Sequence, residues 1–282
     1  MALFKKIIEE VGRPAILVGN GINLLTNIFP SWDELLKSIS SSDLETDGLA
    51  NTEIYDFIEL KSEKGKELKK LVSNRFESVE IDSKAHQDFI ELLILKECPV
   101  LTTNFDFSFE KSFNNFEGSF YRTAKNNFTR FYPWDTYFGT RQLEYPTDGF
   151  GIWHIHGMIS YTDSIRLGLS DYMGSVEKAS KIIRKEGKKL FNGDNLFNWD
   201  GQKTWLHIWF NMPLIIVGLT LSSSEVFIRW LLIEREKYFK IFPDRRQKTY
   251  YLSKNENTHL NSFLSNLNIK LERSADYASL YR

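Results

Sequence analysis

The sequence predicts an α/β protein with a doubly wound parallel sheet and helical insertions. Several short apolar runs are continuous rather than alternating, which is typical of parallel strands covered on both faces. Segments with apolar residues at helical spacing separate these runs, as expected where helices connect parallel strands. The chain has 282 residues, 42% of them hydrophobic, which is enough for a closed core.

The first predicted strand lies between two predicted helices. Residues 3–11 carry apolar side chains at helical spacing, and the continuous apolar run 15–18 follows as a strand that leads into the loop 19–23. Glu34 stands three residues after Ser31, a spacing that predicts a helix beginning in a capping box. The order is therefore strand, glycine loop, helix.

The rest of the chain supplies further strands and two insertions. Helical periodicity predicts a mostly helical insertion around residues 41–97, and polar composition predicts a second insertion around 160–205. The further predicted strands are residues 99–103, 151–157, 213–218, 248–252 and 269–272. We expect residues 1–282 to form one domain.

Charge and cysteine content exclude several classes of protein. Lys and Arg number 36 against 37 Asp and Glu, so no strong field favours nucleic acid or an anionic membrane. The one cysteine, Cys98, excludes an intramolecular disulfide and a four-cysteine zinc site. Acidic Glu9 and Glu10 interrupt what would be the apolar part of a signal peptide, and no apolar stretch approaches the ~20 residues of a membrane span. We expect a cytoplasmic protein.

Aromatic side chains gather in residues 105–138. This segment holds thirteen aromatic residues, with four acidic and four basic ones. Without excess positive charge, core packing or a partner surface is favoured over a platform for single-stranded nucleic acid.

Four polar motifs follow four of the predicted strands, and ligands of open parallel sheets bind at this end of the strands. The motifs are Gly19-Asn20-Gly21-Ile22-Asn23, Thr102-Thr103-Asn104-Phe105-Asp106, His154-Ile155-His156-Gly157 and Gly218-Leu219-Thr220-Leu221-Ser222. Each motif alone has a plainer explanation: a tight turn for the glycines, helix capping for Asn104 and Asp106, and a core position for the histidines.

Other nucleotide and metal sites are disfavoured. Leu24 stands where a dinucleotide-binding G-x-G-x-x-G motif would have its third glycine, and no P-loop motif occurs. Strand alternation predicts that His154 and His156 share one face, which allows a metal pair. No third ligand can be assigned, so we expect no metal.

In this order the four motifs resemble the sirtuin-like family, over roughly residues 14–255. The stretch Pro30-Ser31-Trp32-Asp33-Glu34-Leu35-Leu36 looks like the helix start of its divergent bacterial antiphage-defence branch. The resemblance implies that the doubly wound sheet is Rossmann-like and that the chain forms an NAD-binding domain whose substrate is NAD. In that branch it implies a toxic effector that hydrolyses NAD to nicotinamide and ADP-ribose, in abortive infection by NAD depletion.

The resemblance also implies roles for particular residues. Asn104 matches the catalytic asparagine beside the nicotinamide ribose, His156 matches the catalytic histidine, and Asp106 matches the aspartate that holds the nicotinamide carboxamide. The other expected NAD-binding residues are Gly19, Asn20, Gly21, Asn23, Thr103, Gly218, Thr220, Ser222 and Ser253.

Two departures from the family pattern favour water as the acceptor of ADP-ribose. Deacylating sirtuins carry a zinc ribbon of four cysteines, and their motif has Gln where this chain has Thr103.

Three alternatives to NAD hydrolysis remain: an NAD-dependent protein deacylase, a non-catalytic module that senses NAD or ADP-ribose, and a metal-dependent hydrolase. A toxic enzyme needs control, so we expect a separate regulatory or sensor protein encoded nearby and a homo- or hetero-oligomer.

Overall fold

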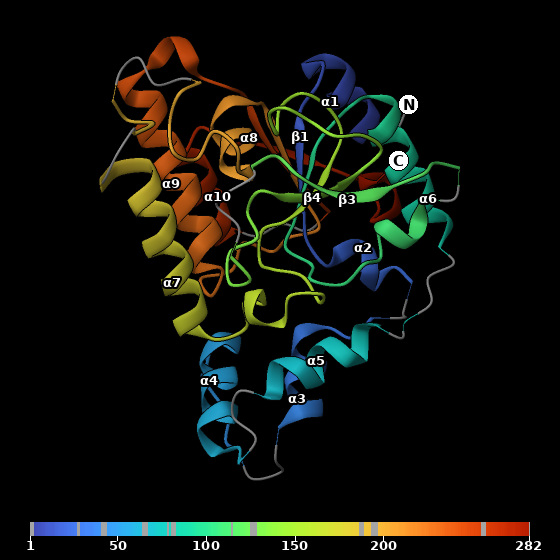
Figure 1. Cartoon of the computed structure of the whole chain (residues 1–282), viewed down its shortest axis with the longest axis vertical. Coiled ribbons are helices and arrows are strands. Elements are labelled where there is room, and N and C mark those ends of the chain that lie inside the picture. The colour runs from blue at the N-terminus through green and yellow to red at the C-terminus, as the bar shows by residue number, and fades with distance from the viewer. Residues whose placement is uncertain are drawn as a thin grey trace.

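The computed structural model contains one eight-stranded sheet, in the order β3-β4-β5-β2-β1-β6-β7-β8 (Figure 1). The strands are β1 (Ala15–Val18), β2 (Val100–Thr102), β3 (Ser119–Arg122), β4 (Thr136–Gly139), β5 (Ile152–His154), β6 (Leu214–Val217), β7 (Thr249–Ser253) and β8 (Lys270–Arg273). The structure describes residues 3–26, 29–40, 44–63, 67–77, 79, 83–113, 115–124, 129–185, 189–192, 197–254 and 258–281.

Six neighbouring strands, from β5 to β8 in the sheet order, are parallel, which confirms the predicted Rossmann-like α/β class. The sheet is mixed rather than wholly parallel, because β4 pairs with β5 and β3 pairs with β4 in antiparallel fashion. This two-strand extension lies in the aromatic-rich segment 105–138, where no strand was predicted. All six predicted strands are present, five of them within one residue of the expected bounds, whereas β5 ends at His154, three residues before the expected end.

Helices cover both faces of the sheet. They are α1 (Leu3–Val11), α2 (Gly21–Leu24), α3 (Trp32–Ile39), α4 (Asn51–Lys61), α5 (Leu68–Glu77), α6 (Lys84–Leu95), α7 (Leu169–Ser180), α8 (Trp205–Asn211), α9 (Val226–Ile241) and α10 (Thr258–Asn266). The capping box predicted at α3 is confirmed, since Ser31 N–H donates to Glu34 Oε2 at 2.7 Å and Glu34 N–H donates to Ser31 Oγ at 3.3 Å.

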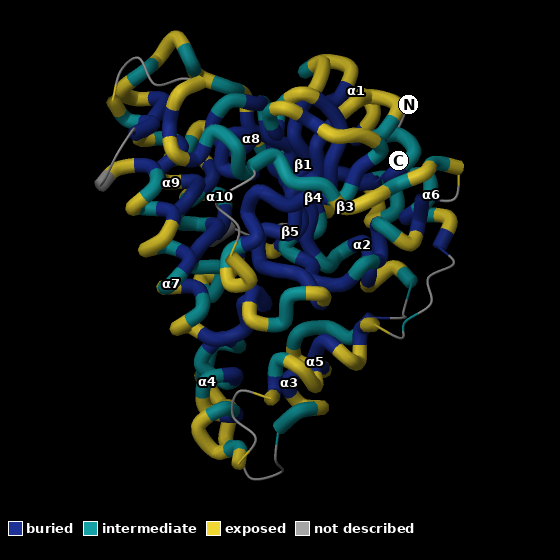
Figure 2. The backbone as a smooth tube through the Cα atoms, in the orientation of Figure 1, coloured by how far each residue is buried: buried dark blue, intermediate teal, exposed yellow. Residues whose placement is uncertain are grey.

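The central strands are apolar throughout because their two faces pack into different cores. In β1, Ala15 and Leu17 belong to one hydrophobic cluster, whereas Ile16 and Val18 belong to another. Every residue of β1 and β6 is fully buried, and Figure 2 shows the buried centre of the molecule in dark blue. Two covered faces leave no position for a polar side chain, so polar residues begin where the strands end.

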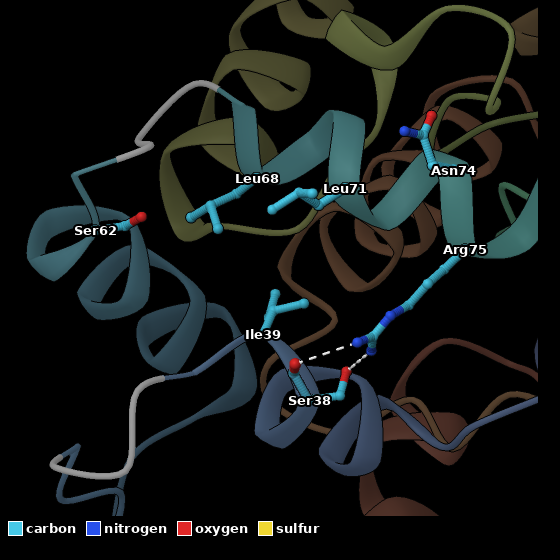
Figure 3. Close-up of a pocket in the computed structure, with 7 residues that line it drawn as sticks. All are labelled: Ser38, Ile39, Ser62, Leu68, Leu71, Asn74 and Arg75. Carbon is cyan, nitrogen blue, oxygen red and sulfur yellow. Dashed lines mark hydrogen bonds between the residues drawn. The ribbon is translucent and has the colours of Figure 1, made fainter.

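Helices α3, α4 and α5 lie together at the end of the molecule away from α1 (Figure 1). They form a third apolar cluster, which includes Leu36, Tyr55 and Val72. Beside it lies a pocket of about 610 Å³ (Figure 3), lined by Ser38, Ile39, Ser62, Leu68, Leu71, Asn74 and Arg75. Arg75 donates hydrogen bonds to the hydroxyl and the carbonyl of Ser38. None of the residues predicted to bind NAD lines this pocket.

Most described aromatic residues of segment 105–138 belong to the hydrophobic clusters or pack against them. Phe109, Trp134 and Tyr137 are at most 4% exposed, whereas Phe120 and Phe131 are 45% and 56% exposed. Arg122 pairs with the buried Asp135 at 2.8 Å, so part of the balanced charge is internal. Within the described ranges, no helix has the length and apolar character needed to cross a membrane.

Candidate functional site

The first predicted motif lies against the fourth at the carboxyl ends of β1 and β6. Gly19 N–H donates to Val217 O at 3.1 Å, and Gly21 N–H donates to Gly218 O at 3.0 Å. A Cβ at Gly19 would lie 2.5 Å from Gly218 O, and one at Gly21 would lie 2.7 Å from Gly218 Cα. Glycine is therefore required because the two backbones touch. The backbone N–H groups of these two predicted NAD-binding glycines are therefore hydrogen-bonded to Val217, the last residue of β6, and to Gly218, which follows it.

Tyr281 packs against the same glycines. A Cβ at Gly21 would lie 2.6 Å from Tyr281 Oη, and one at Gly218 would overlap the same hydroxyl. The Tyr281 side chain is 2% exposed, and among the described residues its hydroxyl has no hydrogen-bond partner. Burial raises the pKa of Tyr281, so the hydroxyl stays neutral. No motif in the sequence marks this residue, because its contacts are with glycines that are distant in the sequence.

The second motif joins this glycine cluster through Asn104, which follows β2. Asn104 is 5% exposed, and its Nδ2 donates to Gly19 O at 3.4 Å. Its backbone N–H donates to Thr102 Oγ1 at 3.0 Å, which fixes the turn that follows the strand. The structure therefore brings the predicted catalytic asparagine against the predicted glycine loop.

Asp106 is fully enclosed and held by two hydrogen bonds. Asn23 Nδ2 donates to its Oδ2 at 3.0 Å, and Ser108 N–H donates to its Oδ1 at 2.9 Å. Burial raises the pKa of Asp106, and hydrogen bonding by Ser108 opposes that shift. The amide oxygen of Asn23 also has a hydrogen-bond partner, because Oδ1 lies 2.8 Å from His86 Nε2.

His86 completes this network as a neutral imidazole. Burial lowers the pKa of His86 to about 4, so at neutral pH one ring nitrogen donates and the other accepts. Nε2–H donates to Asn23 Oδ1, and Nδ1, 2.9 Å from Ser83 Oγ, accepts from that hydroxyl. Asn23 thus fixes the position of Asp106 and is itself held by His86, a residue that the sequence analysis did not single out.

This network predicts a large stability cost for Asn23→Ala. The substitution removes one partner from Asp106 Oδ2 and one from His86 Nε2, and each lost partner of a buried polar group costs about 1–3 kcal/mol. We expect the free energy of unfolding to fall by about 3 kcal/mol in urea titrations. A loss well below about 1 kcal/mol would show that the network contributes little.

The third motif places its two histidines in different surroundings. The strand β5 ends at His154, whose Nδ1–H donates to Asn104 O at 2.7 Å and whose Nε2 lies 2.7 Å from Glu110 Oε1. Burial alone would lower the pKa of His154, but Glu110 and the hydrogen bonds outweigh it, so the net shift is upward. His154 therefore supports the backbone of the predicted catalytic Asn104.

His156 packs instead against Tyr172 of α7 and Phe227 of α9, with ring centroids 5.0 Å and 6.3 Å away. The prediction that His154 and His156 share a face is wrong, because the chain leaves the strand after His154 and turns at Gly157, where φ is 88°. Burial, with a contribution from Arg166, lowers the pKa of His156 to about 3, so its imidazole is neutral. Its Nε2 is buried and has no partner in the described part of the chain.

The remaining predicted site residues lie along the same edge of the sheet. Thr103 N–H donates to Val18 O at 3.1 Å, and Asn20 Nδ2 donates to Pro30 O at 3.3 Å. Three others, at the ends of β6 and β7, are exposed or half-buried: Thr220, Ser222 and Ser253. Since β6 neighbours β1 and β7 neighbours β6, these residues lie progressively farther along the edge from Asn104.

Among the residues missed by sequence analysis is a carboxylate, Glu225. It lies directly before α9, and its Oε2 is buried with no partner among the described residues. Burial raises the pKa of Glu225 to about 7. The sequence did contain a sign of this residue, because an acidic residue stands three positions after Ser222, just beyond the fourth motif. No group of three or more His, Cys, Asp or Glu side chains that could hold a metal is found in the described ranges.

Comparison with known proteins places the chain in a family. A search of curated proteins finds no match. A solved structure described as "Structural Basis for the Mechanism and Regulation of Sir2 Enzymes" is similar with 12% identity and a TM-score of 0.43, over 97% of this chain and 90% of that one. The family model of the SIR2-like domain matches residues 99–271, which is more than half of the chain. The chain therefore belongs to the SIR2-like domain family.

Proposed function

We propose that this chain hydrolyses NAD to nicotinamide and ADP-ribose, as a toxic effector that depletes NAD in antiphage defence. The observation that carries the proposal is the placement of Asn104 and His156. They follow the paired strands β2 and β5, both are at most 5% exposed, and within the described residues His156 Nε2 has no partner. An unpartnered buried nitrogen after β5 and a buried amide after the neighbouring strand β2 suit a polar ligand, and membership of the SIR2-like family supports NAD.

The chemistry suits these residue types. A water oxygen bonds to C1′ of the nicotinamide ribose, while the bond from C1′ to the pyridinium nitrogen breaks and its electron pair stays with neutral nicotinamide. The transition state resembles that of glycoside cleavage, with positive charge on the ribose. The Asn104 amide can donate and accept at once, and so orients water and a ribose hydroxyl together. Asp106 accepts a hydrogen bond from the departing carboxamide.

His156 enters this proposal as a neutral group. With its pKa lowered to about 3, the imidazole offers one donor and one acceptor nitrogen at neutral pH. Such a ring positions a ribose hydroxyl well, but it is a weak acceptor of the proton that water loses. The site therefore needs a second group for that proton.

The proposal includes how the enzyme is organised and controlled. We treat residues 1–282 as one NAD-binding domain, since the single sheet takes strands from Ala15 to Arg273. Control comes from a regulatory protein encoded nearby or from assembly into an oligomer, because constant NAD cleavage would kill the host. Water is the acceptor and no metal takes part, in keeping with Thr103 and the single cysteine.

The test is chromatography of NAD, nicotinamide and ADP-ribose after incubation with the purified chain, alone and with proteins encoded beside it. We expect NAD to be lost without any acylated peptide and in the presence of a chelator. Turnover only with acylated peptide would identify a deacylase. Ligand-induced thermal stabilisation without product would identify a sensing module.

A further inference from the structure

Asn104 combines a loosely held side chain with a firmly held backbone. The hydrogen bond described for its side chain is long, 3.4 Å from Nδ2 to Gly19 O. Its backbone N–H donates to Thr102 Oγ1 at 3.0 Å, and its carbonyl accepts from His154 Nδ1–H at 2.7 Å. The direction of the Asn104 amide is therefore set by the backbone turn, which His154 holds from the neighbouring strand β5.

A carboxylate lies on the other side of the His154 ring. Glu110 stands in a short 3₁₀ helix (Glu110–Ser112) that follows β2, and its Oε1 lies 2.7 Å from His154 Nε2. The side chains of His154 and Glu110 are 0% and 6% exposed, so water competes little for this contact. Two short hydrogen bonds thus connect the Glu110 carboxylate, the His154 imidazole and the Asn104 carbonyl.

The partners of the His154 ring show where its protons lie. A backbone carbonyl can only accept a hydrogen bond, so Nδ1 carries a proton. Nε2 lies at a distance from Glu110 that is typical of a charge-assisted bond, and a buried carboxylate needs a compensating charge. Burial lowers the pKa of His154, but the charge of Glu110, the hydrogen bonds to Glu110 and Asn104, and the charge of Asp106 raise it, and the net shift is upward. These contacts favour a ring that is protonated on both nitrogens.

The contact with a carboxylate distinguishes His154 from other buried histidines in the described chain. Three of them hydrogen-bond to uncharged side chains: His86, His156 and His207. Burial lowers the pKa of these three to about 4, 3 and 4, respectively. The histidine that holds the turn of Asn104 is thus the one that Glu110 keeps charged.

We propose that Glu110 and His154 are positioning residues, which hold the turn of Asn104 through a protonated imidazole so that the Asn104 amide points at the attacking water. This inference rests on the proposed NAD hydrolysis and on the role of Asn104 in it. In this role neither residue touches NAD, and the imidazole keeps both protons throughout the reaction. We call the chain of contacts from Glu110 through His154 to Asn104 O the relay. It should affect the rate of the chemical step more than the binding of NAD.

The first test measures kcat and KM for nicotinamide release by Glu110→Ala and Glu110→Gln. Alanine leaves His154 Nε2 without a partner, so the ring can turn away from Asn104 O. For Glu110→Ala we expect kcat to fall about 10- to 100-fold, with a change in KM below about threefold. The amide of glutamine can donate to a neutral His154 Nε2 and leave Nδ1–H on the carbonyl. Glu110→Gln should therefore recover most of the lost rate.

The second test replaces the histidine. The amide nitrogen of asparagine lies as many bonds from the backbone as Nδ1 of histidine, so in His154→Asn it can still donate to Asn104 O. We expect His154→Asn to keep a kcat within about tenfold of the wild type, and His154→Ala to lose at least as much as Glu110→Ala. Combining His154→Ala with Glu110→Ala should cost no further rate, because one relay is broken in each. The double variant also leaves no unpaired buried charge, and so tests the loss of rate if a single variant does not fold.

The matched control is Glu234→Ala. Glu234 is a buried carboxylate of α9 that pairs with Arg184 and Lys237 and with no residue of the site. Its loss should lower the unfolding temperature and leave kcat per folded protein unchanged. If Glu110→Ala behaved in the same way, Glu110 would be a structural residue and the inference would be overturned.

Nitrogen-15 NMR of the histidine rings gives a readout that does not depend on NAD. At neutral pH the wild type should show a His154 ring with both nitrogens protonated, assigned by its absence from His154→Asn. In Glu110→Ala the proton on Nε2 should be lost. A wild-type His154 ring that lacks a proton on either nitrogen would overturn the relay.

The outcomes separate the two proposals. An unchanged kcat in Glu110→Ala and His154→Ala, from an active wild type, would overturn the positioning role and leave NAD hydrolysis standing. A wild type that releases no nicotinamide, alone or with the proteins encoded beside it, would contradict NAD hydrolysis itself, while the NMR signals of His154 still test the relay.

Discussion

Replacing Asn104 with alanine is expected to lower nicotinamide release at least about 100-fold while the protein stays folded. The amide is the group that orients the attacking water, and alanine can neither donate nor accept. The structural cost should be small, because the described contact of the side chain is one long hydrogen bond, 3.4 Å from Nδ2 to Gly19 O. Chromatographic rates and thermal unfolding of the same samples check both parts.

The matched control is Asn266→Ala, an exposed asparagine on α10 whose Nδ2 donates to Ser262 O at 2.8 Å. Its rate should equal that of the wild type. If Asn104→Ala kept the wild-type rate, the assignment of Asn104 as the water-orienting residue would be wrong. If the unfolding temperature of Asn104→Ala fell sharply, its loss of rate would say nothing about catalysis. The test would then use Asn104→Asp, which keeps the size of the side chain.

Gly218→Ala is expected to cause the largest loss of stability. Gly218 has φ 65°, a conformation that costs an alanine about 1–2 kcal/mol. The new Cβ would also overlap Tyr281 Oη and lie 3.3 Å from the backbone of Gly21. We expect the conformational cost and the overlap together to lower the free energy of unfolding by at least about 3 kcal/mol, as measured in urea titrations.

Two further variants separate the causes of that loss. Gly48 has φ 75°, and a Cβ added there would meet no atom within 4 Å, so Gly48→Ala should show the conformational cost alone. Tyr281→Phe removes the overlapping hydroxyl, so in the double variant with Gly218→Ala part of the loss should be recovered. Equal losses for Gly48→Ala and Gly218→Ala would show that the contact with Tyr281 carries no weight.

The parts of the fold that follow from local sequence could be predicted. A strand such as β1 is apolar at every position because each face has its own core, and the pattern itself reveals this. The start of α3 depends on Ser31 and Glu34 alone, two residues within one turn. Among the predicted site residues, Asn104 reaches Gly19 because parallel strands bring their carboxyl ends to one edge.

The parts that depend on distant contacts could not be predicted. The strands β3 and β4 extend one side of the sheet by antiparallel pairing, which depends on contacts between strands and not on a pattern within either one. The orientation of His156 depends on where β5 stops, which strand periodicity does not reveal. Tyr281 lies against Gly21 and Gly218 because folding brings these residues together, and no spacing in the sequence encodes such contacts.

The most direct measurement is the ratio of products formed from NAD by the wild-type chain, alone and with the proteins encoded beside it, in the absence of any acylated peptide. NAD hydrolysis predicts nicotinamide and free ADP-ribose in equal amounts, both formed at least about 100-fold more slowly by Asn104→Ala. Intact NAD under every condition, or nicotinamide released without free ADP-ribose, would contradict it.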